Sequence, residues 1–290
     1  MRVNELIAWM RRAYQIKTSG KGDLIYVEFP TTPTVRYGEG KPPHPQLKAM
    51  FDAGSGAYRA LVTQFAIYAA DFARYRDNPV DQPVPTFRST WFPLFDAIAL
   101  YGMVRHFKPA RIIEIGSGNS TFIARAAVDD GKLNTHITAI DPHPRRDIAQ
   151  AAHTVINVPL EATDLAFVET LDANDILFFD GSHQTFQNSD VTVFFLDVLP
   201  RLRPGVIVQI HDIFLPYDYP THWLGRYYSE QYMLACWLLA GGDKTEILLP
   251  NGYMIRKETH LDVFTPFMTA LGDDLTPFLL HGGSFWLRVR

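Results

Sequence analysis

The chain has 290 residues, of which 47% are hydrophobic and 13% aromatic, and 27 basic against 31 acidic side chains give a formal net charge of −4. This apolar share can bury a core, which excludes an intrinsically disordered chain. The small negative net charge produces no positive electrostatic potential that would attract nucleic acid or anionic lipid, so we expect neither as a partner. The length predicts one large domain, or one domain with an appendage.

The single cysteine, Cys236, excludes an internal disulfide and any zinc site built from several thiolates. Its neighbours are apolar, so we expect it to be buried. The first fifteen residues have no uninterrupted apolar stretch and do not read as a secretory signal. The longest wholly apolar segment, 233–240, is far shorter than the ~20 residues that cross a bilayer. We therefore expect a cytoplasmic protein without a membrane partner.

The sequence changes character near residue 86. Before it, helical patterns, the clearest over 58–75, alternate with loops rich in proline and glycine. We expect residues 1–85 to form a mainly helical extension that serves either as a lid or as a homo-oligomer contact. Residues 86–290 are expected to form the main domain.

The main domain alternates helical patterns with short apolar runs. Helices are expected over 92–107, about 120–128 and 145–152, and strands over 111–115, 137–140, 155–158, 176–179 and 206–210. Short apolar runs separated by helices are typical of a doubly wound parallel α/β sheet. Residues 245–249 and 285–289 are expected to close this sheet as an antiparallel edge pair.

Ligands of an open parallel sheet bind beyond the carboxyl ends of its strands. The segments that follow the five expected strands are Gly116–Ser120, Asp141–His143, Pro159–Glu161, Asp180–His183 and His211–Asp212. Nearly all the polar side chains that could bind or react with a ligand in this domain are therefore expected at one edge of the sheet.

The glycine-containing loop after the first strand favours a nucleoside-type cofactor. Gly116 and Gly118 let the chain turn tightly and let a ligand approach the backbone. A dinucleotide fold needs a third glycine where this chain has Thr121, and Glu114 beneath the turn disfavours a pyrophosphate. Asp141, at the end of the second strand, suits hydrogen bonds from ribose hydroxyls. A plain strand–helix connection would also explain the glycines.

Residues 112–121 (IIEIGSGNST) resemble the first motif of class I S-adenosylmethionine-dependent methyltransferases, in the form found in a bacterial methyltransferase-24-like group with an N-terminal extension. Further matches are 139–142, 178–183, 202–208 and 211–212. The resemblance covers roughly 86–256 and the closing residues 282–287. It implies a Rossmann-like seven-stranded methyltransferase sheet in residues 86–290.

The resemblance also implies a donor site. Glu114, Gly116 and Gly118 would hold the methionine part of S-adenosylmethionine, and Asp141 its ribose. Pro159–Glu161 lies where such enzymes place the adenine. Further donor contacts are expected from Ser117, Asn119, Ser120, Pro142 and Asp180.

Asp180, His183, His211 and Asp212 follow two strands that are expected to be neighbours. The set is similar to that of metal-dependent sugar O-methyltransferases of the macrocin and mycinamicin type. Carried over, Asp180 and Asp212 would hold a divalent metal, with His183 as the base. The chain departs from that family at His211, where the acidic pair would have a carboxylate. We expect Asp180, His211 and Asp212 as the metal ligands, and Asp180 and His183 as the catalytic pair. Carboxylates suit Mg²⁺, while the imidazole of His211 shifts the preference toward Mn²⁺ or Fe²⁺.

Each of these residues also has a structural interpretation: Asp180 as a strand cap, His183 as a helix cap, and His211–Asp212 as a structural pair. The function we expect is methyl transfer from S-adenosylmethionine to a small-molecule acceptor, at oxygen. The alternatives are a metal-dependent hydroxylase-like relative and a non-catalytic nucleoside-binding scaffold protein. A nicotinamide oxidoreductase is disfavoured by Thr121 and Glu114.

Overall fold

The structure is a computed structural model that describes residues 7, 10, 11, 14, 18, 28, 29, 31–89, 91–279 and 281–290. Contacts divide the chain into two compact units, Met1–Thr34 and Val35–Arg290. Most of the first fifteen residues, which do not read as a secretory signal, lie outside the described residues. Within the part of the chain that the structure describes, no helix is long and apolar enough to cross a membrane.

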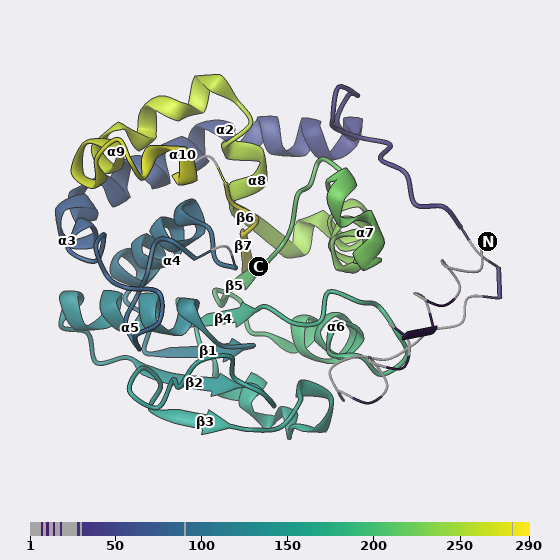
Figure 1. Ribbon diagram of the computed structural model, residues 1–290, viewed down its shortest axis with the longest axis horizontal. Coiled ribbons are helices and arrows are strands. Elements are labelled where there is room, and N and C mark those ends of the chain that lie inside the picture. The colour runs from purple at the N-terminus through teal and green to yellow at the C-terminus, as the bar shows by residue number, and fades with distance from the viewer. Residues whose placement is uncertain are drawn as a thin grey trace. The chain divides into compact units, whose positions relative to one another are not determined.

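Seven strands form one mixed sheet in the order β3-β2-β1-β4-β5-β7-β6 (Figure 1). The strands are β1 (Arg111–Ile115), β2 (His136–Ile140), β3 (Thr154–Ile156), β4 (Ile176–Phe179), β5 (Ile207–Ile210), β6 (Thr245–Pro250) and β7 (Phe285–Val289). The first five pair in parallel, and β7 runs antiparallel to both β5 and β6. The expected fold class, a doubly wound Rossmann-like sheet of seven strands, is confirmed.

The helices alternate with the strands as expected for this class. They are α2 (Pro45–Phe65), α3 (Ala69–Ala73), α4 (Leu94–Phe107), α5 (Asn119–Gly131), α6 (Asp190–Val193), α7 (Glu230–Gly241), α8 (Asn251–Met254), α9 (Thr265–Leu271) and α10 (Thr276–Leu279). The pattern over 58–75 located the end of α2 and all of α3, but α2 begins earlier. Pro45 occupies its first turn and His44 caps it by accepting the Leu47 amide at 3.4 Å.

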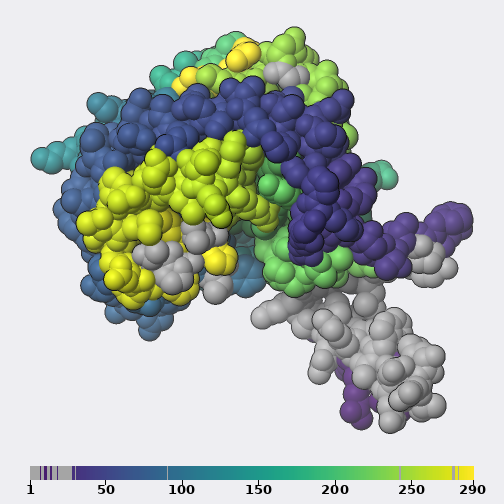
Figure 2. Space-filling view, turned by 90° about the horizontal axis from the view of Figure 1, so that it is seen from above, coloured from purple at the N-terminus to yellow at the C-terminus, as the bar shows by residue number. Residues whose placement is uncertain are grey.

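Residues 45–89 share their core with the sheet. Helix α2 packs on α4 and β6 and lies beside the C-terminal helices α8 and α9 (Figures 1 and 2). A Cβ atom on Gly102 of α4 would stand 2.4 Å from the Phe65 ring, so a glycine permits this close packing. Phe72 of α3 stacks on Phe87 at 4.2 Å between ring centroids. The domain boundary at residue 86 stays a prediction, but α2 and α3 belong to the unit that contains the sheet.

Two expectations about the main domain are wrong. Residues 145–152, expected as a helix, form turns, and the Asp147 carboxylate accepts the Ala149 amide at 3.1 Å in place of a helical bond. Cys236 is exposed, because α7 buries the face that carries Leu234 and Leu238.

Candidate active site

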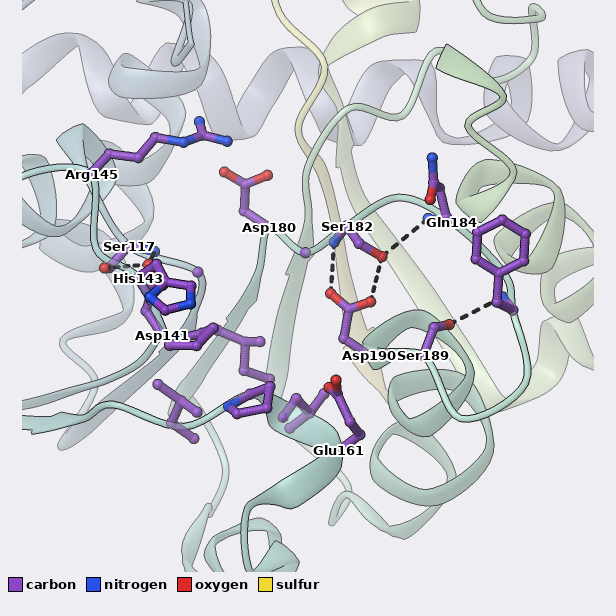
Figure 3. A pocket seen from close by; sticks show the side chains of 18 residues that line it. Ser117, Asp141, His143, Arg145, Glu161, Asp180, Ser182, Gln184, Ser189 and Asp190 are labelled. Atoms are coloured by element: carbon purple, nitrogen blue, oxygen red, sulfur yellow. Dashed lines mark hydrogen bonds between the residues drawn. The ribbon is translucent and has the colours of Figure 1, made fainter. Parts of the chain in front are cut away.

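A cavity of about 490 Å³, the first cavity, opens where β1, β2, β3 and β4 end (Figure 3). It is lined by the expected donor residues Gly116, Ser117, Asp141, Pro142 and Asp180, and also by Pro159, Leu160 and Glu161. Figure 3 shows Asp141 with Ser117 on one side and Asp190 with Ser182 on the other. The structure therefore brings four loops together at the edge of the sheet where parallel α/β folds bind ligands.

The two glycines of the loop after β1 serve different purposes. Gly116 has a φ of 79°, and a Cβ atom there would stand 2.0 Å from the Asp180 carbonyl oxygen. Only glycine therefore allows the loops after β1 and β4 to touch. A Cβ atom on Gly118 would meet no protein atom within 4 Å. Gly118 borders a third cavity of about 250 Å³, which also takes in Ser117, Asn119, Ser120 and Asp180.

Asp141 holds the loops together as well as lining the first cavity. Its Oδ2 accepts hydrogen bonds from the Ser117 amide at 2.8 Å and the Ser117 hydroxyl at 2.7 Å. Its Oδ1 accepts the His143 amide at 2.8 Å. A carboxylate has about four acceptor positions, so Asp141 retains capacity for a ligand hydroxyl.

Two other expected donor residues are engaged within the protein. The Asn119 side chain donates to the Thr86 carbonyl at 2.7 Å and accepts the Thr86 amide at 3.0 Å, which ties the glycine loop to the segment before α4. Glu114 is 2% exposed and lines neither the first nor the third cavity. The Ser120 hydroxyl donates to its Oε1, while its Oε2 has no hydrogen-bond partner among the described residues. Burial raises the pKa of Glu114 to about 8.

The loops after β4 and β5 bring imidazoles and carboxylates into one cluster. The Nε2 atom of His183 lies 3.4 Å from Asp180 Oδ1 and 3.4 Å from Asp212 Oδ2. The Nδ1 atom of His211 lies 3.4 Å from Asp180 Oδ1 and 3.5 Å from Asp212 Oδ1. The four residues predicted to meet therefore do meet. We call Asp180, His183, His211 and Asp212, with their partners Asp96 and Glu230, the acid–imidazole cluster.

Opposite charges within the cluster stabilise one another. Burial by itself lowers the pKa of His183 and of His211, but hydrogen bonds and charges from the neighbouring carboxylates raise both well above the usual value. Burial by itself raises the pKa of Asp180, and the two imidazoles more than reverse this, so that it falls below its usual range. Burial raises the pKa of Asp212.

Backbone geometry singles out two members of the cluster. His183 and Asp212 have φ values of 62° and 56°, in the left-handed region that L-residues adopt at a cost of roughly 1–2 kcal/mol. The two residues follow different strands, β4 and β5. Left-handed residues of this kind gather at functional sites, where the surrounding structure holds them in place.

As arranged, the cluster does not fit a divalent metal. Each of the four imidazole nitrogens of His183 and His211 lies within 3.5 Å of a carboxylate oxygen, so the carboxylates of the cluster face the imidazoles and do not converge on a shared cation position. Over the described ranges, no group of three or more His, Cys, Asp or Glu side chains has an arrangement that could hold a metal ion. The expected ligands Asp180, His211 and Asp212 are close together, but they pair with one another.

A second cavity, of about 580 Å³, borders the cluster at Asp212. Asp212 forms part of its lining, together with aromatic side chains that include Trp91, Phe214 and Trp223. Asp180 lines the first cavity. His183 is 6% exposed and lines neither cavity, but its Nε2 atom lies between these two carboxylates.

Sequence reasoning did not place three residues of this site. Glu230, at the start of α7, bonds His183 Nδ1 at 2.7 Å, and Asp96 of α4 lies 3.4 Å from His211 Nε2. Both are separated from the strand ends by long stretches of chain, so no local pattern could identify them. Arg145 lines the first cavity with its guanidinium 4.5 Å from the Trp91 ring centroid. Residues 145–152 were expected to form a helix, and a helix would not have placed Arg145 in the first cavity.

A comparison with protein families bears on the same residues. Residues 113–213 match the family model described as a methyltransferase domain. The matched segment contains the loops after β1, β2, β3, β4 and β5, and it supports a class I S-adenosylmethionine-dependent methyltransferase.

One curated relative is an uncharacterized protein from Archaeoglobus fulgidus. It is 37% identical over 94 residues, which is 29% of this chain and 41% of the relative. The chain thus spans less than half the length of that relative.

Solved structures with similar architecture are more distant. The SAH-bound methyltransferase PaMTH1 of Podospora anserina is 15% identical, with a TM-score of 0.43 over 88% of this chain and all of that one. The plantazolicin methyltransferase BpumL, in complex with a pentazolic desmethylPZN analog and SAH, is 11% identical, with a TM-score of 0.42 over 80% of this chain and 99% of that one. Similarity at these identities and TM-scores does not indicate the activity of this chain.

Proposed function

We propose that the chain transfers the methyl group of S-adenosylmethionine to an oxygen of a small-molecule acceptor, with His183 as the base. One observation carries this proposal: Asp180 lines the first cavity, Asp212 lines the second, and His183 Nε2 lies 3.4 Å from both carboxylates. A donor in the first cavity and an acceptor in the second would meet at the acid–imidazole cluster. The cytoplasmic location expected from the sequence is part of the same proposal.

Three features of the first and third cavities suit the donor. The volume of about 490 Å³ is in the range of small-molecule sites. Asp141 offers carboxylate oxygens for ribose hydroxyls, and the space beside Gly118 lets a ligand approach the backbone.

The chain's own residues would position the acceptor and take up its proton. Asp212 accepts the hydrogen bond of an acceptor hydroxyl, and the proton passes to Nε2 of His183 when that ring is neutral. Because the neighbouring carboxylates raise the pKa of His183 well above its usual value, the neutral ring forms and turnover rises toward high pH. Glu230 holds Nδ1 of the same ring and so fixes its orientation. S-adenosylmethionine supplies a methyl group on a cationic sulfur, so that a carbon–oxygen bond forms as the carbon–sulfur bond breaks and the electron pair stays on sulfur. Asp180 gives the first cavity a negative charge, which favours a cationic ligand.

Calorimetric titration tests this proposal. S-adenosylmethionine and S-adenosylhomocysteine should bind with one site per chain, NAD should not bind, and EDTA should change none of these results. Binding or turnover that requires added Mn²⁺ or Mg²⁺ would assign the acid–imidazole cluster to a metal instead. Binding of NAD alone would exclude the methyltransferase proposal.

A further inference from the structure

The second cavity has a chemical character of its own. Its wall combines flat apolar side chains, among them Trp223 and Phe214, with two arginines, Arg226 and Arg256. His222 and His281 also line it. Small-molecule sites are usually mostly apolar with a few polar groups that fix orientation. Two permanent cations in one cavity therefore indicate a specific ligand group.

Neither arginine has a carboxylate partner within the described part of the chain, because no ion pair within 4.0 Å involves Arg226 or Arg256. Asp212, the carboxylate in the lining, faces His183 and His211 instead. The pKa of Glu39 is lowered mainly by hydrogen bonds from Thr221. The positive charge of Arg256 contributes less to lowering the pKa of Glu39.

Aromatic rings hold the two guanidinium groups in place. The Arg226 guanidinium carbon lies 4.1 Å from the centroid of Trp223 and 5.5 Å from that of Tyr228. The Arg256 guanidinium carbon lies 4.6 Å from the centroid of Tyr217 and 5.6 Å from that of Phe214. Arg256 also donates one N–H to the Phe214 carbonyl at 3.4 Å. Stacking uses the faces of a guanidinium, so the other N–H groups at its edges can still bind a carboxylate, in a bidentate fashion where two of them are available.

We propose that the second cavity binds an acceptor with a carboxylate on a flat apolar body. The carboxylate pairs with Arg226 and Arg256, the flat body packs against Trp223 and Phe214, and the acceptor hydroxyl faces Asp212. This inference rests on the proposed methyl transfer, because it takes the second cavity as the acceptor site.

Two probes of similar size, one anionic and one neutral, test the inference: para-hydroxybenzoate and para-hydroxybenzamide. Titrations are run on the full chain saturated with S-adenosylhomocysteine, and repeated with two-ring analogues of both probes. In at least one pair the carboxylate should bind roughly tenfold to a hundredfold more tightly than the amide. Arg226→Gln and Arg256→Gln should each remove most of this preference while leaving the affinity for the amide unchanged.

Arg288→Gln is the matched control, because Arg288 also lies over an aromatic ring, 5.0 Å from the Phe107 centroid, but outside the second cavity. Its preference should equal that of the wild type. Wild-type protein without a preference for the carboxylate in any pair, or variants that weaken both probes equally, would overturn the inference. Failure to bind S-adenosylhomocysteine at all would instead reject the proposed function, so the two failures are distinguishable.

Discussion

Nδ1 of His183 lies 2.7 Å from Oε2 of Glu230, although 47 positions separate the two residues in the sequence. The His183 carbonyl also accepts the amides of Ser229 at 2.8 Å and Glu230 at 3.2 Å, which fixes the start of α7 against the loop after β4. The imidazole ring lies 4.6 Å from the ring of Tyr228. Glu230 is therefore a positioning residue for the proposed base.

Glu230→Gln is expected to lower kcat by about tenfold to a hundredfold, because an amide can still bond the ring but no longer stabilises its positive charge. The pH profile of kcat should move to lower pH, since the carboxylate raises the pKa of His183. A residue with only a structural role would not move that profile. Glu169→Gln, an exposed carboxylate paired with Arg201, serves as the control and should leave both readings unchanged.

His183→Ala should lower turnover by roughly 10²–10⁴, the usual contribution of a general base, and should spare the affinity for S-adenosylhomocysteine. The reason is that His183 lines neither cavity and contacts the first cavity only through Asp180. Single-turnover kinetics and calorimetry measure the two quantities separately. Turnover at the wild-type rate would deny His183 its role as base.

Asp141→Ala should weaken binding of S-adenosylmethionine by about 1–3 kcal/mol, because ribose hydroxyls and the bonds from Ser117 and His143 lose their acceptor. Asp147→Ala is the control, since that carboxylate accepts only a local backbone amide and lines neither of the two main cavities. Titration calorimetry compares the two variants. Equal affinities would mean that the donor ribose binds elsewhere.

The sequence predicted the sheet well because its signals are local. Buried parallel strands are short and mostly apolar: β4 reads ILFF, and β1 reads RIIEI. Each strand ends at the polar residues that form the site. The meeting of Asp180 with Asp212 followed from strand order alone. Fold class and the membership of the acid–imidazole cluster after β4 and β5 were therefore predictable.

Other features depend on tertiary packing and left no local signal. Helix α7 is apolar on all sides, so its sequence could not show that Cys236 faces solvent while Leu234 and Leu238 face the core. Glu230 reaches His183 only because α7 starts against the loop after β4. Of the arginines of the second cavity, Arg226 contacts aromatic rings close to it in the chain, but Arg256 reaches Tyr217 from a distant segment.

Two lysines offer a test of backbone strain away from the site. Lys108 and Lys132 end α4 and α5 in the left-handed region, each with a φ of 50°. Lys108→Gly and Lys132→Gly are each expected to raise the free energy of unfolding by about 0.5–1 kcal/mol, because glycine adopts this conformation without strain. Ala57→Gly, at an exposed position within α2, should lower it by about 1 kcal/mol. Urea unfolding measures all three, and a destabilised Lys108→Gly protein would contradict the assigned backbone.

Glu114 predicts how stability depends on pH. Its pKa is about 8 in the folded chain against 4.5 for the unfolded one, so between these values the folded state holds a proton that the unfolded state has released. The contribution of Glu114 to stability therefore falls as pH rises through this window, by up to about 1.4 kcal/mol per pH unit. Glu114→Gln cannot ionise, and the variant should lose this slope. Urea unfolding at about pH 6 and about pH 8 compares the two proteins. Identical slopes would mean that the Glu114 carboxyl is already ionised in the folded protein.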